Sequence, residues 1–281
     1  MDSLLHTAGV ADMGWQGRIR VTGKDRLRWL SGMVTNTVQA LPEGEGNFSF
    51  VLNAQGRIQG DCQVYRRAAD LLLDSSRDQI PALLRHLEHY IIMDDVELED
   101  VSGQWTALAL IGPLAPKILA ALGIPVSSGP PVDGNSRLRA VQFPSSDGLL
   151  VEAPGMILPR YELWCDPAAV LTLWKAAKEA GARPVGSQAL EALRVLEGVP
   201  LYAVDIGDRD LPQETGQMHA LHFSKGCYLG QEIVERIRSR GKVHRQFRQF
   251  RLEGGPLQPP FDLLREGRIV GRITSTASLA G

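Results

Sequence analysis

The order of strand-like and helix-like segments repeats along residues 18–181, and this repetition most constrains the fold. Apolar residues alternate where we expect strands and recur at helical spacing where we expect helices, as at Leu27, Leu30 and Val34. The first round places a strand at 18–22, a helix after Gly23, a hairpin at 48–65, a strand at 71–74, a helix at 79–90 and an extended stretch ending near 101. The second round places a strand at 106–111, a helix after Pro113, a loop at 123–135, strands near 137–143 and 156–164 and a helix at 166–181. Two such rounds predict two related α+β units.

The chain changes character after the second round. A helix at 186–197 and a long irregular loop precede a helix at about 230–240, with Gly241 where a C′ glycine belongs. Beyond Arg245, glycines, prolines and alternating residues indicate β structure. We therefore expect residues 1–245 to form one region of two α+β subdomains and residues 246–281 to form a separate small β segment.

The composition excludes several classes of protein. The 281 residues are 44% hydrophobic and 22% charged, which is typical of a packed globular chain, and the net charge of -2 creates no field that would draw the whole chain to nucleic acid. The longest clean apolar stretch, 106–112, is far below the ~18 residues of a membrane span. The N-terminus has no basic residue before Arg18 and so resembles neither a signal nor a transit peptide. We expect a cytoplasmic protein without a membrane partner.

The segment 225–232, Lys-Gly-Cys-Tyr-Leu-Gly-Gln-Glu, is the most unusual in the chain. It places Cys227 just ahead of the predicted helix at 230–240, where the helix dipole and Lys225 would favour the thiolate. The alternative is that Cys227 is a small buried hydrophobe. Cys62 and Cys165 lie within predicted strands and are expected in the core. Three cysteines without a CxxC pair argue against a disulfide framework and a structural zinc site.

Three other features suggest ligands. Residues 225–248 hold seven basic and two acidic residues, which fits a solvated helix end, an RNA or a polyglutamylated cofactor tail. His86 and His89 have the spacing of two ligands on one helix face, but no third ligand is evident, and we expect no metal site. Trp15, just before the first predicted strand, is a candidate for stacking on a flat heterocycle.

These residues resemble the YgfZ-type folate-binding proteins, relatives of the glycine-cleavage aminomethyltransferase (T-protein). Segment 225–232 is similar residue for residue to the K-G-C-Y-x-G-Q-E signature of that family, and Arg236 and Gly241 follow it. Coverage is about residues 18–245, and the supporting matches are Val21-Thr22-Gly23-Lys24-Asp25, Thr35-Asn36, Leu52-Asn53, Gly56-Arg57, Arg194, Gly198, Pro200, Pro212 and Glu214.

The resemblance implies an α+β fold of two interleaved ferredoxin-like domains and a C-terminal β-barrel around a folate-sized cavity. The barrel should be short or incomplete, because its motif begins at 267–275 and six residues remain. The resemblance also implies bound tetrahydrofolate or a related reduced folate, a role in making or maintaining iron-sulfur proteins, and an essential motif cysteine. We assign the chemistry to Cys227 and Lys225. The residues expected to hold the folate are Trp15, Asn53, Asp61, Arg194, Glu197, Glu214, Tyr228, Gln231, Glu232 and Arg236.

Two departures separate the branches of the family. The aminomethyltransferase has an Asp-Asp pair whose first acid falls on Gly60 here, and a pterin-contacting Glu that falls on Leu196. Neither residue can hold folate or move a proton, which argues against classical turnover. The leading hypothesis is therefore an iron-sulfur assembly or repair factor that serves client proteins. Two alternatives stay open: a folate-dependent aminomethyltransferase, and a tRNA-binding module that uses residues 236–248.

Overall fold

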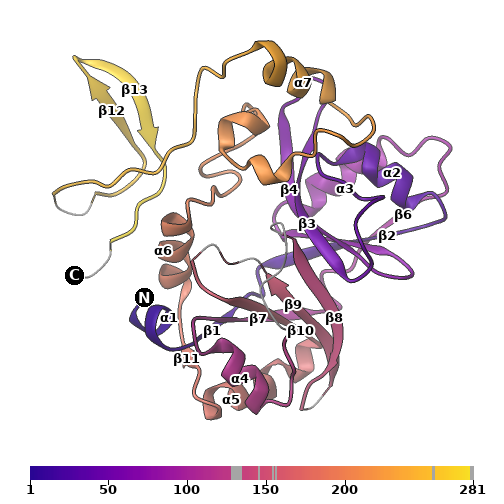
Figure 1. Cartoon of the computed structure of the whole chain (residues 1–281), viewed down its shortest axis with the longest axis vertical. Coiled ribbons are helices and arrows are strands. Elements are labelled where there is room, and N and C mark those ends of the chain that lie inside the picture. Colours follow the sequence, from indigo (N-terminus) through magenta and orange to yellow (C-terminus); the bar gives the residue numbers. More distant parts are fainter. Residues whose placement is uncertain (128–134, 145, 154, 156, 255–256, 279–281) are drawn as a thin grey trace.

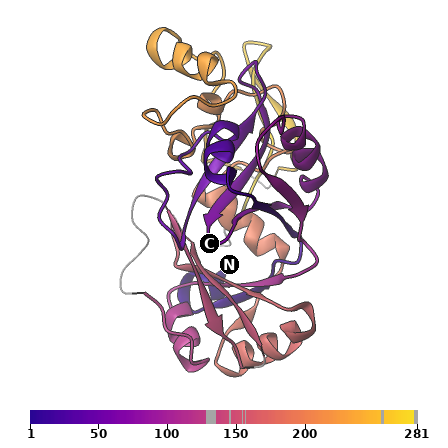
Figure 2. The same ribbon diagram turned by 90° about the vertical axis from the view of Figure 1, so that its right-hand side faces the viewer.

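The structure is a computed structural model, which describes residues 1–127, 135–144, 146–153, 155, 157–254 and 257–278. Figures 1 and 2 show two lobes, each a sheet covered by helices on its outer side, and a hairpin that stands apart from both. In the described residues, eleven strands form one sheet in the order β11-β1-β7-β10-β9-β8-β3-β4-β5-β2-β6. Its strands are β1 (Gly9–Asp12), β2 (Gln16–Thr22), β3 (Glu45–Leu52), β4 (Ile58–Arg66), β5 (Leu71–Ser76), β6 (Glu97–Asp100), β7 (Thr106–Ile111), β8 (Ser136–Gln142), β9 (Asp147–Ala153), β10 (Arg160–Cys165) and β11 (Arg183–Pro184).

The sheet consists of two halves that meet at a short seam. Strands β2 to β6 form the first half, and β1 with β7 to β11 forms the second. Only two residue pairs, Glu45 with Arg137 and Gly46 with Ser136, join β3 to β8. Strand β1 pairs with β7 rather than with β2, so the N-terminal segment belongs to the second half.

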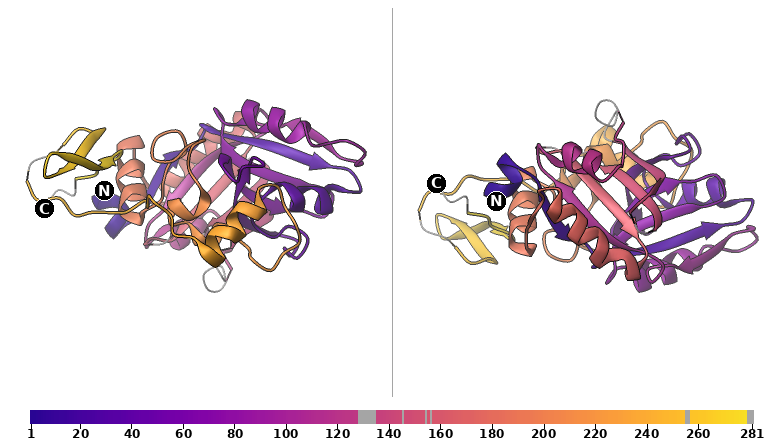
Figure 3. Two further views of the ribbon diagram at one scale, coloured as in Figure 1. Left: turned by 90° about the horizontal axis from the view of Figure 1, so that it is seen from above. Right: turned by 90° about the horizontal axis from the view of Figure 1, so that it is seen from below.

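Helices cover the outer face of each half because their apolar residues recur at helical spacing. Trp29, Leu30 and Leu83 bring α2 and α3 against the first half, and Ile118 and Leu173 bring α4 and α5 against the second. Helix α6 packs at the junction of the two halves and α7 follows the long loop, as Figures 1 and 3 show. The helices are α1 (Asp2–His6), α2 (Arg26–Met33), α3 (Ile80–Glu88), α4 (Ala115–Ala121), α5 (Val170–Glu179), α6 (Ser187–Glu197) and α7 (Gln231–Arg240), with short 3-10 turns at Pro167–Ala169, Pro212–Thr215 and Met218–Ala220.

The inner faces of the two halves pack against each other through a buried, partly charged cluster. The Arg18 guanidinium lies 3.8 Å from the ring centroid of Trp164 and 3.0 Å from Asp74 Oδ1. Gln16 Nε2 donates to Asp74 and to Glu162, which come from different halves. This cluster holds the inner faces of the two halves together. The inner face of the first half includes side chains of β4.

Most of the predicted elements are confirmed, but α1, β1 and β11 were not expected, and three further details differ. Between the predicted strands near 137–143 and 156–164 lies β9, which we did not expect, and β10 begins only at Arg160. Gly241 ends α7 in an extended conformation with φ -112° and is therefore not a left-handed cap. Residues 128–134 of the expected loop and Met156 lie outside the described residues.

The C-terminal segment forms a hairpin. Strands β12 (Phe261–Arg265) and β13 (Arg268–Ile273) pair antiparallel with a bulge at Leu263, and no closed barrel is present in the part of the chain that the structure describes. The hairpin is tied back to the body through Ser275, which contacts Arg194 and Asp205. None of the described helices is long and apolar enough to cross a membrane.

Candidate functional site

The segment 225–232 forms a loop that leads into α7 and presents Cys227 to solvent. Cys227 is exposed, whereas Cys62 and Cys165 are buried, as expected. Burial raises the pKa of the Cys62 thiol and raises that of Cys165 to about 11. Of the three thiols, only that of Cys227 is therefore open to a reagent or partner, and the alternative of a buried hydrophobe is wrong.

Lys225 anchors this loop. Its Nζ donates to the carbonyl oxygens of Val34 and Asn36, each at 2.6 Å, and lies 4.9 Å from the ring centroid of Tyr228. Burial lowers the pKa of Lys225 to about 7, while the two carbonyls favour the ammonium form. These contacts tie the loop to the end of α2, and the direct chemical role assigned to Lys225 stays a prediction.

Two glycines let the loop pack on the turn between β3 and β4. Gly230 has φ +80°, and a Cβ there would lie 2.6 Å from the carbonyl oxygen of Asn53. Gly56 has φ +70°, and its Cβ would lie 2.8 Å from Cβ of Ile233. Asn53 Oδ1 accepts hydrogen bonds from the backbone N–H groups of Gln55 and Arg57, so this side chain shapes the turn. The motif loop and the turn are thus one packed unit.

The other motif residues divide between the core and the surface. Tyr228 is buried against Phe50, and its hydroxyl has no hydrogen-bond partner among the described residues. Gln231 Oε1 accepts a hydrogen bond from the Tyr228 N–H. Glu232 and Arg236 form an ion pair at 2.9 Å with both side chains largely exposed, so they face solvent.

Arg194 is a structural clamp. Its five N–H groups all donate within the protein, to Glu191 twice, Val199, Asp205 and Ser275. The Asp205 side chain is fully buried. A folate could reach this guanidinium only by displacing one of those partners.

The remaining candidates lie apart from one another. Glu197 accepts a hydrogen bond from the Ile157 N–H. Glu214 accepts from the Leu211 N–H and lies 3.5 Å from Arg245. Trp15 is half exposed at the turn between β1 and β2. The contacts of these residues are within the protein, and their assignment to folate stays a prediction.

Asp61 occupies a different position from the motif loop. Along β4, Gly60, Cys62 and Val64 face α2 and α3, whereas Asp61 and Tyr65 alternate onto the inner face of the sheet. Burial raises the pKa of Asp61 to about 6, although a hydrogen bond from Gln79 opposes this. Asp61 is also among the groups that raise the pKa of Tyr202, which comes from the loop after α6. A carboxyl that holds a proton close to neutral pH can exchange one with a ligand.

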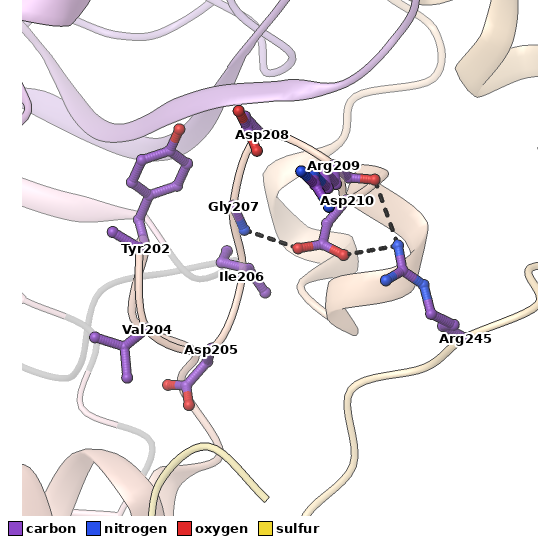
Figure 4. Close-up of a pocket in the computed structure, with 10 residues that line it drawn as sticks. Tyr202, Val204, Asp205, Ile206, Gly207, Asp208, Arg209, Asp210 and Arg245 are labelled. Carbon is purple, nitrogen blue, oxygen red and sulfur yellow. Dashed lines mark hydrogen bonds and ion pairs between the residues drawn. The ribbon is translucent and has the colours of Figure 1, made fainter. Parts of the chain in front are cut away.

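Tyr202 lines a cavity of about 430 Å³ formed by residues 202–210 and Arg245. Figure 4 shows the Tyr202 ring extending toward the first half of the sheet, and Arg245 closing the other end through Asp210 at 3.0 Å. A groove of about 1620 Å³ adjoins it, between the end of α6, residues 244–254 and the hairpin. The two share Asp205, Ile206, Asp210 and Arg245 as a common wall.

The two departures from the aminomethyltransferase pattern lie in different surroundings. A Cβ on Gly60 would come within 2.7 Å of Leu83 Cδ2 and 3.0 Å of Gln79 Oε1, so a carboxylate there would enter the contact between β4 and α3. Leu196 lines the large groove, and its carbonyl accepts a hydrogen bond from Gln249. Position 60 thus faces the helices, and the acid on the inner face is Asp61.

Sequence reasoning missed residues that matter here because their contacts span long separations. Tyr202 and Gln79 reach Asp61 from distant segments, and Arg245 bridges Asp210 and Glu214. In the sequence, the one sign of a site in that loop is the high polarity of residues 205–210. His86 Nε2 donates to the Leu52 carbonyl oxygen at 3.0 Å, and the described residues contain no cluster of metal-binding side chains.

The basic stretch is partly neutralised. Arg236, Arg238 and Arg245 each form an ion pair with a nearby acid. The side chain of Arg240 lies outside the described residues. The tRNA contact through 236–248 stays a prediction.

Comparisons with known proteins place the fold. Residues 2–128 match the family model of the GCVT N-terminal domain. The chain is 26% identical over 278 residues to the chloroplastic "Putative transferase" of Arabidopsis thaliana, covering 98% of this chain and 63% of that protein. It is 29% identical over 270 residues to the aminomethyltransferase of Rubrobacter xylanophilus, covering 95% and 72%.

Among solved structures, the crystal structure of glycine cleavage system aminomethyltransferase T from Bartonella henselae superposes with a TM-score of 0.72 at 20% identity, covering 82% of this chain and 63% of that chain. The chain thus spans less than two thirds of the length of the Arabidopsis and Bartonella proteins. The α+β fold is therefore similar to that of the aminomethyltransferase, and the match to the GCVT N-terminal domain and the relatives among the aminomethyltransferases agree with this likeness.

Proposed function

We propose that this protein binds a reduced folate and transfers a one-carbon unit to or from it, as a folate-dependent transferase of the aminomethyltransferase type. The observation that carries the proposal is Asp61, an acid on the inner face of a GcvT-like sheet whose pKa burial raises to about 6. The names of the relatives favour this reading over iron-sulfur assembly, which none of them mentions.

The described residues fit a reduced folate. Ligand cavities have volumes of roughly 300–1,000 Å³ and combine apolar walls with a few polar groups. The cavity of about 430 Å³ beside Tyr202 has such a volume, although five of its ten lining residues are charged, and it adjoins the larger groove. Tyr202 in the cavity wall would stack on the pterin, Asp61, which acts on Tyr202 from β4 but is not itself part of that wall, would hydrogen-bond to it, and Arg245 would face the acidic end.

The folate, when bound, supplies the nitrogen atoms that carry the one-carbon unit. Asp61 holds a proton in this account and orients the pterin by hydrogen bonding. Because its pKa lies near 6, both the protonated and the ionised forms are populated close to neutral pH, which suits a group that exchanges protons with a substrate.

The absence of an acid at Gly60 does not remove this capacity. Residue 60 points at Leu83 and Gln79, away from the inner face, so an acid there would be separated from the cavity by the sheet. The loss at Leu196 is different, because that residue lines the groove, and the carboxylates of the groove wall come from other segments. We therefore expect weaker folate binding than an enzyme with both acids would have.

The experiment compares Asp61→Asn with Asp147→Asn, an exposed aspartate at the start of β9. Formation of methylene-tetrahydrofolate is followed with an aminomethylated lipoyl carrier, and tetrahydrofolate binding is measured in parallel. We expect turnover by the wild type and by Asp147→Asn, and a loss of at least about 100-fold in Asp61→Asn, the scale of general acid-base catalysis. Equal rates for all three proteins, or no turnover by the wild type, would overturn the proposal.

A second candidate function rests on Cys227. It is the one exposed thiol among the three, and it lies in the segment that resembles the YgfZ signature. We propose as this second candidate that the thiol takes part in maintaining iron-sulfur proteins. Complementation of a deletion strain separates the candidates: a Cys227→Ala protein that fully restores iron-sulfur enzyme activity rules out this role and leaves the first candidate intact.

We also propose that residues 246–281 act as a separate segment that closes the large groove. The hairpin contributes residues to the groove wall and contacts the body through Thr274 and Ser275. Limited proteolysis should cut first in the exposed stretch 250–254, ahead of any cleavage in the eleven-stranded sheet.

A further inference from the structure

The pairing of β4 with β5 stops before β5 ends, and side chains take over where the two strands separate. The pairing of β4 with β5 begins at Gln63 and Asp74, so Asp61 has no strand partner on that side. Instead, the Asp61 N–H donates to Gln79 Oε1 at 3.2 Å, and Ser75 Oγ donates to the Asp61 carbonyl at 2.7 Å. The backbone of Asp61 is therefore satisfied by two side chains where β4 and β5 no longer pair.

The same Gln79 amide also contacts the Asp61 carboxyl. Gln79 Nε2 donates to Asp61 Oδ1 at 3.0 Å, so the amide is bonded to both the backbone and the side chain of one residue. An amide has one acceptor and one donor group, and a rotation would break both contacts at once. Gln79 is the N-cap residue of α3, which packs on the outer face and holds the amide in place.

We propose that Gln79 is a positioning residue for Asp61, which turns Oδ1 into the protein and leaves Oδ2 as the oxygen that carries the proton toward the inner face. Because Oδ1 accepts an N–H, a proton on that oxygen would meet the donor hydrogens of the amide. The inference deepens the proposed function and rests on it for its purpose, since it specifies which oxygen of Asp61 a folate would meet.

Gly60 is part of the same arrangement. A Cβ at this position would lie 3.0 Å from Gln79 Oε1, closer than ordinary contact, and would push the amide from the Asp61 N–H. The residue that replaces the first acid of the aminomethyltransferase pair is thus the residue that leaves room for the Gln79 amide.

The two groups that couple directly to Asp61 stay neutral as it titrates, whereas Asp74 on β5, whose pKa burial raises to about 7, titrates in the same range. Tyr202 faces it from the loop after α6, and Cys62 lies beside it on β4; the pKa values of both are raised. Beyond Cys62, Asp74 on β5 acts on that thiol, and Asp208 acts on Tyr202. No cation of the described residues contributes to the pKa of Asp61, so the Gln79 hydrogen bond is the main side-chain influence on its ionised form.

The test measures the Asp61 carboxyl by carbon-13 NMR between pH 4 and 9, without folate. We compare the wild type with Gln79→Leu, and use two controls. Ser75→Ala removes the other contact to the Asp61 backbone without touching the carboxyl, and Gln59→Leu makes the same chemical change on β4, where Gln59 bonds only to the adjacent carbonyls of Arg57 and Ile58. We expect Gln79→Leu to raise the proton affinity of Asp61 about tenfold, because the ionised form loses its donor, and both controls to titrate like the wild type.

A shift of similar size in Ser75→Ala would show that strand-edge disorder is responsible, and an unchanged midpoint in Gln79→Leu would show that the amide does not control the carboxyl; either result overturns the inference. If Gln79→Leu does not fold, the Gln79 side-chain amide signals of the wild type decide the matter. They should titrate with the same midpoint as Asp61, near 6, and signals that stay constant would contradict us. Because none of these readouts requires folate, failure of the proposed function is detected separately, by the absence of folate binding.

Discussion

Replacing Arg194 tests whether this arginine is a clamp or a ligand-binding residue. Its partner Asp205 has a fully buried side chain, and Arg194 itself is 15% exposed. Breaking such a buried pair from one side leaves an uncompensated charge, which typically costs about 3–5 kcal/mol. Asp205 would keep hydrogen bonds from the Leu201 N–H, Thr274 and Ser275, so we place Arg194→Met at the lower end, about 3 kcal/mol of unfolding free energy. Urea unfolding followed by circular dichroism measures it.

The matched control is Arg236→Met, which removes an ion pair whose partners are both largely exposed. Exposed pairs of this kind contribute about 0–1 kcal/mol, so the control should unfold close to the wild-type midpoint. At a temperature where Arg194→Met is still folded, its affinity for tetrahydrofolate should be retained. The reasoning is refuted if Arg194→Met is as stable as Arg236→Met, or if it is stable but has lost folate binding.

Three further predictions concern the acid, its neighbour and the thiols. The folded pKa of Asp61, about 6, lies above the usual 3.8, so proton binding by Asp61 stabilises the fold fully below pH 3.8, and this stabilisation is lost as the pH rises through 6. The difference in unfolding free energy between Asp61→Asn and the wild type should therefore shift in favour of the variant by on the order of 2 kcal/mol from pH 4 to pH 7. Identical pH profiles of the two proteins would contradict this. Gly60→Asp should lower the free energy of unfolding in urea by about 1–3 kcal/mol, because the new side chain overpacks the contact with α3, and it should not raise turnover. A gain in turnover would show that the acid belongs at position 60. Iodoacetamide should label the folded protein once, at Cys227, whereas Cys62 and Cys165 react only after unfolding; mass spectrometry of the native protein decides.

Sequence patterns identified elements whose partners are close in the chain or whose periodicity is strong. The predicted limits of strand β7, Thr106–Ile111, are those observed. Its alternate residues pack into two different core clusters, so the strand is buried on both faces and the whole run is apolar. Strand β9 was missed because Gly148 and the polar residues before it read as a turn. Strand β1 is four residues long and pairs with β7 about a hundred residues later, a contact that local propensity cannot reveal.

The candidate site shows the same difference between local sequence signals and long-range contacts. Cys227 was found through a contiguous segment, and its exposure ahead of α7 agrees with that prediction. Asp61 was found through the resemblance, but the Gln79 amide that holds it and the Tyr202 ring that faces it are distant in sequence. Arg194 was assigned to folate from the same resemblance, whereas its five donors are all used within the protein. Residue type and spacing indicate chemistry, and only packing shows which partners that chemistry already has.

An anaerobic calorimetric titration with tetrahydrofolate tests the central claim most directly, with wild type, Asp61→Asn and Asp147→Asn measured side by side at pH 7. The account predicts saturable binding by the wild type and Asp147→Asn, and an affinity for Asp61→Asn lower by about tenfold, the effect of losing one hydrogen bond of an ionised group. No saturable heat from the wild type at several temperatures would contradict the account, because the cavity beside Tyr202 and Asp61 would then not be a folate site.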